Sequence, residues 1–157
     1  MQYAQGKIGR VFIVNFEHGD DLLKEIERLA EREGLSFGVI TFLGALAEGD
    51  IVTGPKSMKL PAKPVWRSFN NAMETVGFGT FTRKNNDTAI HIHASFGKGA
   101  KALTGCLRKK SKVFITVEAL ITEIKGVEAA RVLDRRTGYH TLRVVAKKRK
   151  INRKNKK

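Results

Sequence analysis

The residues whose type and spacing best suit chemistry are His91 and His93, which lie two positions apart in the apolar segment IHIHASFGK at residues 90–98. On a β-strand, residues i and i+2 project from the same face, so the two imidazoles are expected side by side. Paired imidazoles are ready metal ligands. The alternative is that both histidines only form hydrogen bonds within the protein.

A metal-dependent enzyme also needs a general base near the metal. Glu74, Glu118 and Glu123 lie in predicted strands, but none has a spacing that marks it as that base. His18 and His140 lie near predicted turns, where we expect exposed side chains without a role. An enzyme is therefore a secondary interpretation of the sequence and not the leading one.

The charge of the chain points to a polyanionic partner. Lys and Arg number 30 against 15 Asp and Glu, which gives a formal charge of +15. The segment KKRKINRKNKK at residues 147–157 has eight basic residues and no acid, so we expect a disordered tail that follows a domain at residues 1–146. Freely moving Lys and Arg neutralise phosphates without choosing a sequence. The basic residues of the tail are Lys147, Lys148, Arg149, Lys150, Arg153, Lys154, Lys156 and Lys157.

Two further groups of basic residues are candidate phosphate contacts, although each could equally be a solvated surface. The first group brackets a glycine-containing loop and comprises Lys98, Lys101, Arg108, Lys109, Lys110 and Lys112. The second lies on a predicted C-terminal hairpin and comprises Arg131, Arg135, Arg136 and Arg143. Backbone amides of Gly97 and Gly99 would add phosphate contacts.

Length and composition predict a single cytoplasmic domain. The 157 residues suit one hydrophobic core. No run of 18 apolar residues is present, and the first ten residues lack the apolar region of a secretory signal. We therefore expect neither a membrane helix nor a membrane partner. Cys106 is the single cysteine, which excludes an intramolecular disulfide and suits a reducing compartment.

The hydrophobic pattern predicts one helix on a mostly antiparallel sheet, an α/β fold of the α+β type. Helical spacing with an acidic cap at Asp21 indicates a helix at residues 21–33, ended by Gly34. Strands are predicted by β-rich segments between turn signals, and residues 35–42 are apolar enough to be buried on both faces. Gly44 is expected to end that strand. The predicted strands are residues 9–16, 35–42, 48–53, 65–68, 73–82, 88–95, 113–124, 131–134 and 139–145.

Phenylalanines in the predicted strands are expected in the core and not as base-stacking platforms. They are Phe12, Phe16, Phe42, Phe78 and Phe81. The helix carries mixed charge on its outer face, so we expect no base-specific reading from it.

Five segments occur in an order that resembles the plant- and prokaryote-conserved (PPC) domain family. They are VFIVNFEHGDDLLKEIERLAEREGL at 11–35, GVITFLGAL at 38–46, METVGFGTF at 73–81, IHIHASFGK at 90–98 and LTGCL at 103–107. Each motif is weak alone, and their common order is what makes the resemblance specific. The resemblance spans residues 9–145.

The resemblance implies a sheet wrapped around a helix, a homotrimer and a role in DNA binding. It also implies a third metal ligand, because Cys106 stands where the family usually has a histidine in a turn. The set His91, His93 and Cys106 is chemically competent for zinc. The alternative for Cys106 is a small buried hydrophobic residue.

The leading prediction is therefore a DNA-binding protein that uses its basic tail and the Lys98 to Lys112 group. RNA is a second candidate polyanion, since such a tail does not distinguish the two. Two different functions compete with nucleic-acid binding, a metal-dependent enzyme and a small-molecule-binding trimer, and both would centre on His91, His93 and Cys106.

Overall fold

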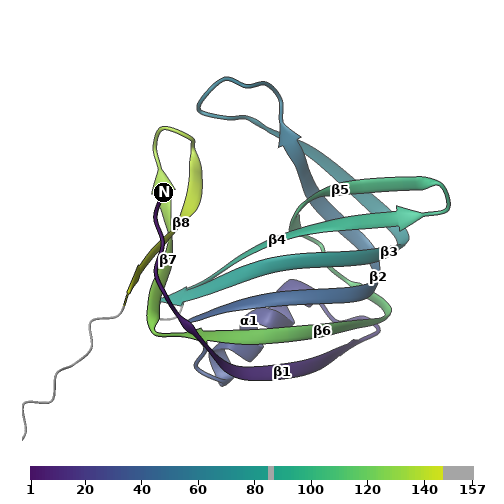
Figure 1. Cartoon of the computed structure of the whole chain (residues 1–157). Coiled ribbons are helices and arrows are strands. Elements are labelled where there is room, and N and C mark those ends of the chain that lie inside the picture. The colour runs from purple at the N-terminus through teal and green to yellow at the C-terminus, as the bar shows by residue number, and fades with distance from the viewer. Residues whose placement is uncertain (85–86, 147–157) are drawn as a thin grey trace, which may run out of the picture.

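The computed structural model describes residues 1–84 and 87–146, and these form one helix and eight strands (Figure 1). The elements are β1 (Lys7–Glu17), α1 (Leu22–Arg32), β2 (Phe37–Pro55), β3 (Pro64–Lys84), β4 (Asp87–Lys98), β5 (Lys101–Lys109), β6 (Val113–Lys125), β7 (Val127–Asp134) and β8 (Tyr139–Ala146). Within these residues no helix is long and apolar enough to cross a membrane. The predicted tail at 147–157 and residues 85–86 lie outside the described residues.

The main sheet has the strand order β1-β6-β2-β3-β4-β5, and every pairing in it is antiparallel. The long strand β2 pairs with β6 along its first half and with β5 through Asp50, Ile51 and Val52. Because β5 pairs with both β4 and β2, the four strands β2 to β5 form a closed ring of hydrogen-bonded strands at this end of β2. The predicted antiparallel sheet with one helix is confirmed, and β7 and β8 form the predicted hairpin as a separate two-stranded sheet.

The helix begins and ends where its capping residues predict. Asp21 Oδ1 accepts a hydrogen bond from the Lys24 backbone N–H at 3.2 Å, and Gly34 adopts a positive φ of 62° after the last turn. Leu22, Ile26 and Ala30 are buried on one face of the helix. They belong to a single hydrophobic core with the inward side chains of the sheet, which α1 covers on one side in Figure 1.

Three predictions about the strands are wrong. Gly44 does not end a strand, because it adopts a φ of 141° at a bulge between β2 and β6, and β2 continues to Pro55. Likewise, the two strands predicted on either side of Asn70 are parts of β3. The segment 35–42 is not buried on both faces, since Ile40 and Phe42 are buried while Thr41 is exposed. Only one face of this sheet is covered by α1.

The uncovered face of the sheet is rich in large apolar side chains. Ile13, Leu120, Thr41 and Phe78 follow one another across β1, β6, β2 and β3 in register. Leu43 and Val76 form a second apolar pair on β2 and β3. The core prediction for Phe78 is wrong, because this residue is 56% exposed. The outward apolar face comprises Ile13, Leu43, Val76, Phe78 and Leu120.

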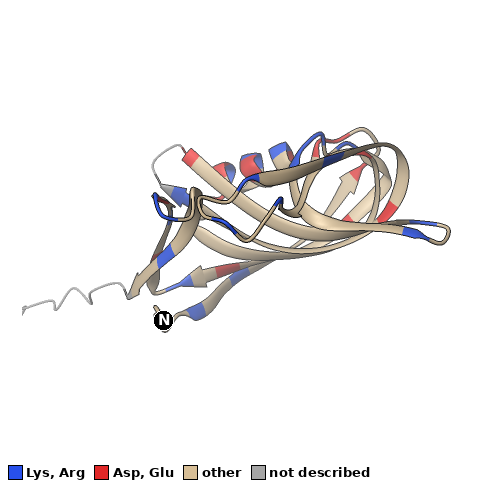
Figure 2. Cartoon of the chain, turned by 90° about the horizontal axis from the view of Figure 1, so that it is seen from above, with Lys and Arg blue, Asp and Glu red and all other residues tan. Residues whose placement is uncertain are grey.

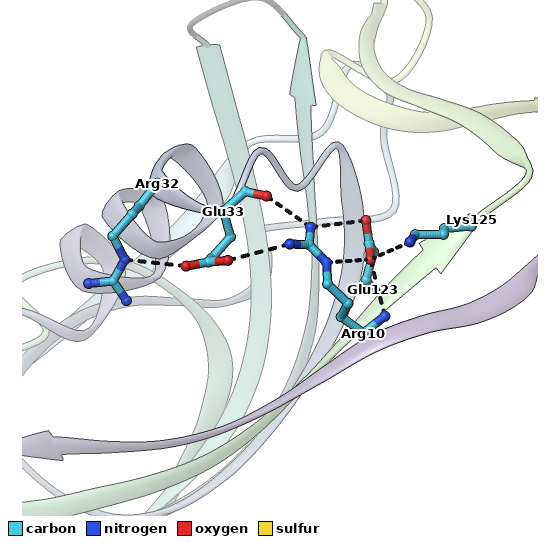
Figure 3. A network of polar contacts seen from close by, with 5 residues as sticks. All are labelled: Arg10, Arg32, Glu33, Glu123 and Lys125. Atoms are coloured by element: carbon cyan, nitrogen blue, oxygen red, sulfur yellow. Dashed lines mark hydrogen bonds and ion pairs between the residues drawn. The ribbon is translucent and has the colours of Figure 1, made fainter.

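A polar network ties the end of α1 to β1 and β6 (Figure 3). The Arg10 guanidinium donates to both carboxylate oxygens of Glu123, at 3.0 and 3.3 Å, and to the Glu33 carbonyl oxygen at 2.8 Å. Lys125 Nζ lies 3.3 Å from Glu123 Oε2. These contacts lower the pKa of Glu123 to about 2, chiefly through the Arg10 hydrogen bond and against the effect of burial. The network fixes α1 against the edge of the sheet opposite to β4 and β5.

Candidate metal centre and basic surfaces

Strand β4 positions His91 and His93 on the outward face of the sheet. The strand alternates, so that Ile92 and Ala94 enter the core while the two histidines project the other way. Their rings lie 5.0 Å apart between centroids and are nearly perpendicular, at 89°. His91 is half-buried and His93 is exposed. The side-by-side arrangement predicted from their spacing is therefore present.

Cys106 lies directly opposite His93, on β5. The turn expected around Cys106 is instead part of a strand, because residues 101–109 pair with β4 on one edge and with β2 on the other. Gly105 allows this close pairing, since a Cβ there would lie 2.5 Å from the Val52 carbonyl oxygen. The ligand atoms of His91, His93 and Cys106 all lie within 4.8 Å of one another.

The surroundings of these side chains alter their protonation. Burial lowers the pKa of His91 to about 4, and the nearby positive charge of Arg131, the second imidazole and Arg108 act in the same direction. His91 is therefore neutral near neutral pH, which is the form of imidazole that binds metals. Burial also raises the pKa of the Cys106 thiol, while Arg108 and Arg131 oppose that shift.

The three side chains line a large cavity between the main sheet and the β7–β8 hairpin, with a volume of about 1000 Å³. The hairpin closes one side of it, and the Ala62 backbone N–H donates to the Thr137 carbonyl oxygen at 3.1 Å, joining the β2–β3 loop to the hairpin turn. Both loops rise on the same side of the main sheet in Figure 1. The lining side chains that can bind ligands or carry charge are His91, His93, Cys106, Arg108, Arg131, His140, Tyr139 and Asp87.

Two of these residues were assigned other roles, or none, from the sequence. His140 was expected to be exposed and without a role, yet it lines the cavity despite its exposure. The sequence predicts that Arg131 contacts phosphate with the other arginines of the hairpin, but its Nη2 donates to Thr80 Oγ1 at 2.8 Å, and the residue lines the cavity. No local pattern reveals this, because the position of the hairpin over β3 and β4 depends on long-range packing. Glu74, Glu118 and Glu123 do not line the cavity.

The basic residues predicted to contact phosphate do not form one patch in the described structure. Lys98 and Lys101 are paired at the tip of the β4–β5 hairpin, the blue tip at the right of Figure 2. Lys109, Lys110 and Lys112 lie at or just beyond the other end of β5. A strand rises by about 3.3 Å per residue, so Lys109 is about 25 Å from Lys101. Lys110 lies 3.8 Å from the Asp50 carboxylate. Arg108, the neighbour of Lys109 on β5, lines the cavity.

Several solved structures share this fold. A metal-containing protein of Archaeoglobus fulgidus is similar with a TM-score of 0.79 and 23% identity, over 90% of this chain and 98% of that one. A PPC protein of Pyrococcus horikoshii has a TM-score of 0.76 and 20% identity, over 91% and 99%. A proposed DNA-binding protein of Bacteroides thetaiotaomicron has a TM-score of 0.70 and 19% identity, over 88% and 96%. At these identities the similarity establishes the fold alone.

No curated protein matches this chain significantly. The model of the Plants and Prokaryotes Conserved (PCC) domain, in contrast, matches residues 3–125, which include α1 and strands β1 to β6. This match covers more than three quarters of the chain and contains all three side chains of the candidate metal centre. The chain therefore belongs to the Plants and Prokaryotes Conserved domain family.

Proposed function

We propose that this protein binds zinc through His91, His93 and Cys106 and that the bound metal serves the adjoining cavity. The observation that carries the proposal is the convergence of three ligand atoms within 4.8 Å, from two strands, at the wall of a cavity of about 1000 Å³. The similar fold of a metal-containing archaeal protein supports it.

The chemistry of the three donors fits zinc. Thiolate and imidazole are both ligands that this ion favours. Zinc–ligand distances of roughly 2.0–2.3 Å place neighbouring donors about 3.5 Å apart, which small side-chain rotations of His93 would reach because this residue is exposed. A site with three protein ligands keeps one position for water or a ligand. Asp87 is the one carboxylate among the described cavity residues, so we assign the site metal-dependent ligand binding and no particular reaction.

The metal content of the purified full-length protein tests this proposal. We expect about one zinc per chain by plasma mass spectrometry in wild type, and a loss of most of it in His93→Ala and Cys106→Ala. His140→Ala is the matched control, since His140 lines the same cavity outside the three-residue set, and it should retain the metal. Wild-type protein that binds no zinc after incubation with the ion and dialysis would refute the proposal.

We further propose that three copies assemble through the outward apolar face. Its five side chains lie on four adjacent strands and are 46–90% exposed, and contiguous apolar surface of this kind marks association sites. A second copy is the occupant because the family resemblance implies a homotrimer. Phe78 and His93 are paired residues on β3 and β4, so this interface would adjoin the metal centre.

A second function, nucleic-acid binding, is favoured by the charge of the chain. The eight basic residues in 147–157 are matched by no acid, and the fold is shared with proposed DNA-binding proteins of Bacteroides thetaiotaomicron and Ralstonia eutropha. Phosphate contacts by the tail and by Lys98, Lys101, Lys109, Lys110 and Lys112 would give binding without base selection. Arg108, the remaining predicted contact of this group, is exposed and also lines the cavity.

Fluorescence anisotropy with duplex DNA tests this second function. Each neutralised phosphate contributes a slope of about −0.9 to the dependence of log K on log salt, so the tail would contribute a slope of up to about −7. We expect deletion of residues 146–157 to remove most of the affinity. Absence of binding at low salt would exclude the function, while equal slopes for the two chains would exclude the tail. A single-stranded RNA of equal length distinguishes the polyanions.

A further inference from the structure

The cavity beside the metal centre is lined by two arginines that pair with no carboxylate among the described residues, and Asp87 is the one carboxylate of its described lining. Arg108 and Arg131 both line it, and guanidinium groups stay protonated in proteins. Neither arginine lies within 4.0 Å of a described carboxylate oxygen. A cavity with this electrostatic character favours an anion.

Arg131 is held in a position from which it could bind such an anion. Its Nη2 is anchored to Thr80 Oγ1 at 2.8 Å, so the side chain is directed across β3 towards His91, the partner of Thr80 on β4. Its Nε is buried and has no hydrogen-bond partner. A buried donor is costly to leave without a partner, so a ligand oxygen that accepts from Arg131 Nε would be stabilised there. Thr141 also lines the cavity, and its buried hydroxyl has no hydrogen-bond partner either.

The remaining residues of the cavity wall indicate what the uncharged part of the ligand is like. Val52, Ile90 and Leu142 supply apolar walls, and Tyr139 adds an aromatic side chain. A cavity of about 1000 Å³ is at the upper end of those that hold small molecules. A cavity of this volume suits a small molecule and not a nucleic-acid duplex. The ligand expected from these walls has an anionic head and an apolar or aromatic body.

We propose that the cavity binds a small organic oxyanion, a carboxylate or a phosphate ester, whose charged oxygens are held by Arg131 beside the metal centre. Guanidinium N–H groups match both kinds of oxyanion geometrically. The proposal rests on the proposed function for its metal-side contact, but the Arg131 contact is independent of the metal. In this proposal Arg131 binds the small oxyanion and is not one of the residues that contact nucleic acid.

Calorimetric titration of the full-length protein with benzoate and phenyl phosphate tests the proposal, and it distinguishes the two oxyanions. Benzamide is the neutral control ligand. We expect benzamide to bind at least about tenfold more weakly than the better oxyanion, since charge-assisted hydrogen bonds are lost. Arg131→Met should weaken oxyanion binding by about tenfold or more, and Arg131→Lys by less. Arg143→Met is the matched control, because Arg143 is an exposed arginine of the same hairpin that does not line the cavity.

Titrations of zinc-loaded and chelator-treated protein separate this proposal from the proposed function. If the protein does not bind zinc but still binds an oxyanion, and Arg131→Met weakens that binding, the metal function is overturned and this inference stands. Zinc binding together with equal affinities for benzamide and both oxyanions would overturn this inference alone. Equal oxyanion affinity in wild type and Arg131→Met would also overturn it, since the oxyanion would then be bound by other basic residues. The benzamide comparison needs only wild-type protein, so equal affinities would overturn the inference even if the Arg131 variants do not fold.

Discussion

His93 and Cys106 are directly opposed residues on the antiparallel strands β4 and β5, and their side chains share the outward face of the sheet. His91 joins them from the position two residues along β4. The candidate metal centre therefore depends on the register of this strand pair. A shift of one residue would place Cys106 on the other face.

The first prediction concerns Gly105, which lets β5 approach β2 beside Cys106. Gly105→Ala places a Cβ 2.5 Å from the Val52 carbonyl oxygen, and overpacking of this kind costs about 1–3 kcal/mol. We expect a lower free energy of unfolding in urea and a reduced zinc content. Gly97→Ala is the matched control, since a Cβ there meets no atom closer than 4.0 Å and the φ angle is ordinary. Equal zinc content in the two variants would contradict this role for Gly105.

The second prediction concerns assembly through the outward apolar face. Phe78→Glu places a charge on this face at β3, and we expect it to convert a trimer of the 17.5 kDa chain into monomers. Sedimentation equilibrium measures this change. Met58→Glu is the control, because Met58 is fully exposed on the β2–β3 loop and lies outside that face. A monomeric wild type at micromolar concentration would contradict the assembly.

The third prediction concerns the pH dependence of stability. The Arg10 hydrogen bonds lower the pKa of Glu123 to about 2 from an ordinary value of 4.5. A depressed folded-state pKa stabilises the fold above the unfolded-state value, and that stabilisation is lost as the pH falls from about 4.5 towards 2. We expect Glu123→Gln to destabilise the protein near neutral pH in urea unfolding, with a difference from wild type that shrinks below about pH 4.5.

Glu128→Gln is the control for this pH dependence, because Glu128 is exposed and makes no ion pair among the described residues. Its difference from wild type should be small at every pH. A Glu123→Gln variant that is as stable as wild type near neutral pH would show that the Arg10 network does not stabilise the fold.

Local signals in the sequence were sufficient for the helix, the terminal hairpin and the pairing of His91 with His93. The caps at Asp21 and Gly34 define the helix, and the alternation of β4 places the two imidazoles together. Strand β5 was missed because residues 101–109 are glycine- and lysine-containing and become a strand only by pairing with β4 and β2. The family resemblance supplied Cys106 as the third member of the set, but not its position on a strand.

The cavity could not be predicted because it is built from segments far apart in the chain. Arg131 and His140 reach it only through the placement of the β7–β8 hairpin, which no local pattern encodes. Phe78 was expected in the core because an apolar residue on a strand is usually buried, and the sequence does not reveal that α1 covers a single face of the sheet. The sequence identifies the basic residues around β5, but it does not show that this strand holds Lys101 and Lys109 at opposite ends.

The most direct test of the account is the visible and near-ultraviolet absorption spectrum of the cobalt(II)-loaded full-length protein. Coordination by Cys106 predicts a thiolate-to-cobalt charge-transfer band that disappears in Cys106→Ser and persists in His140→Ala. Cobalt binding without this band, or an unchanged band in Cys106→Ser, would contradict the proposed His91, His93 and Cys106 metal centre.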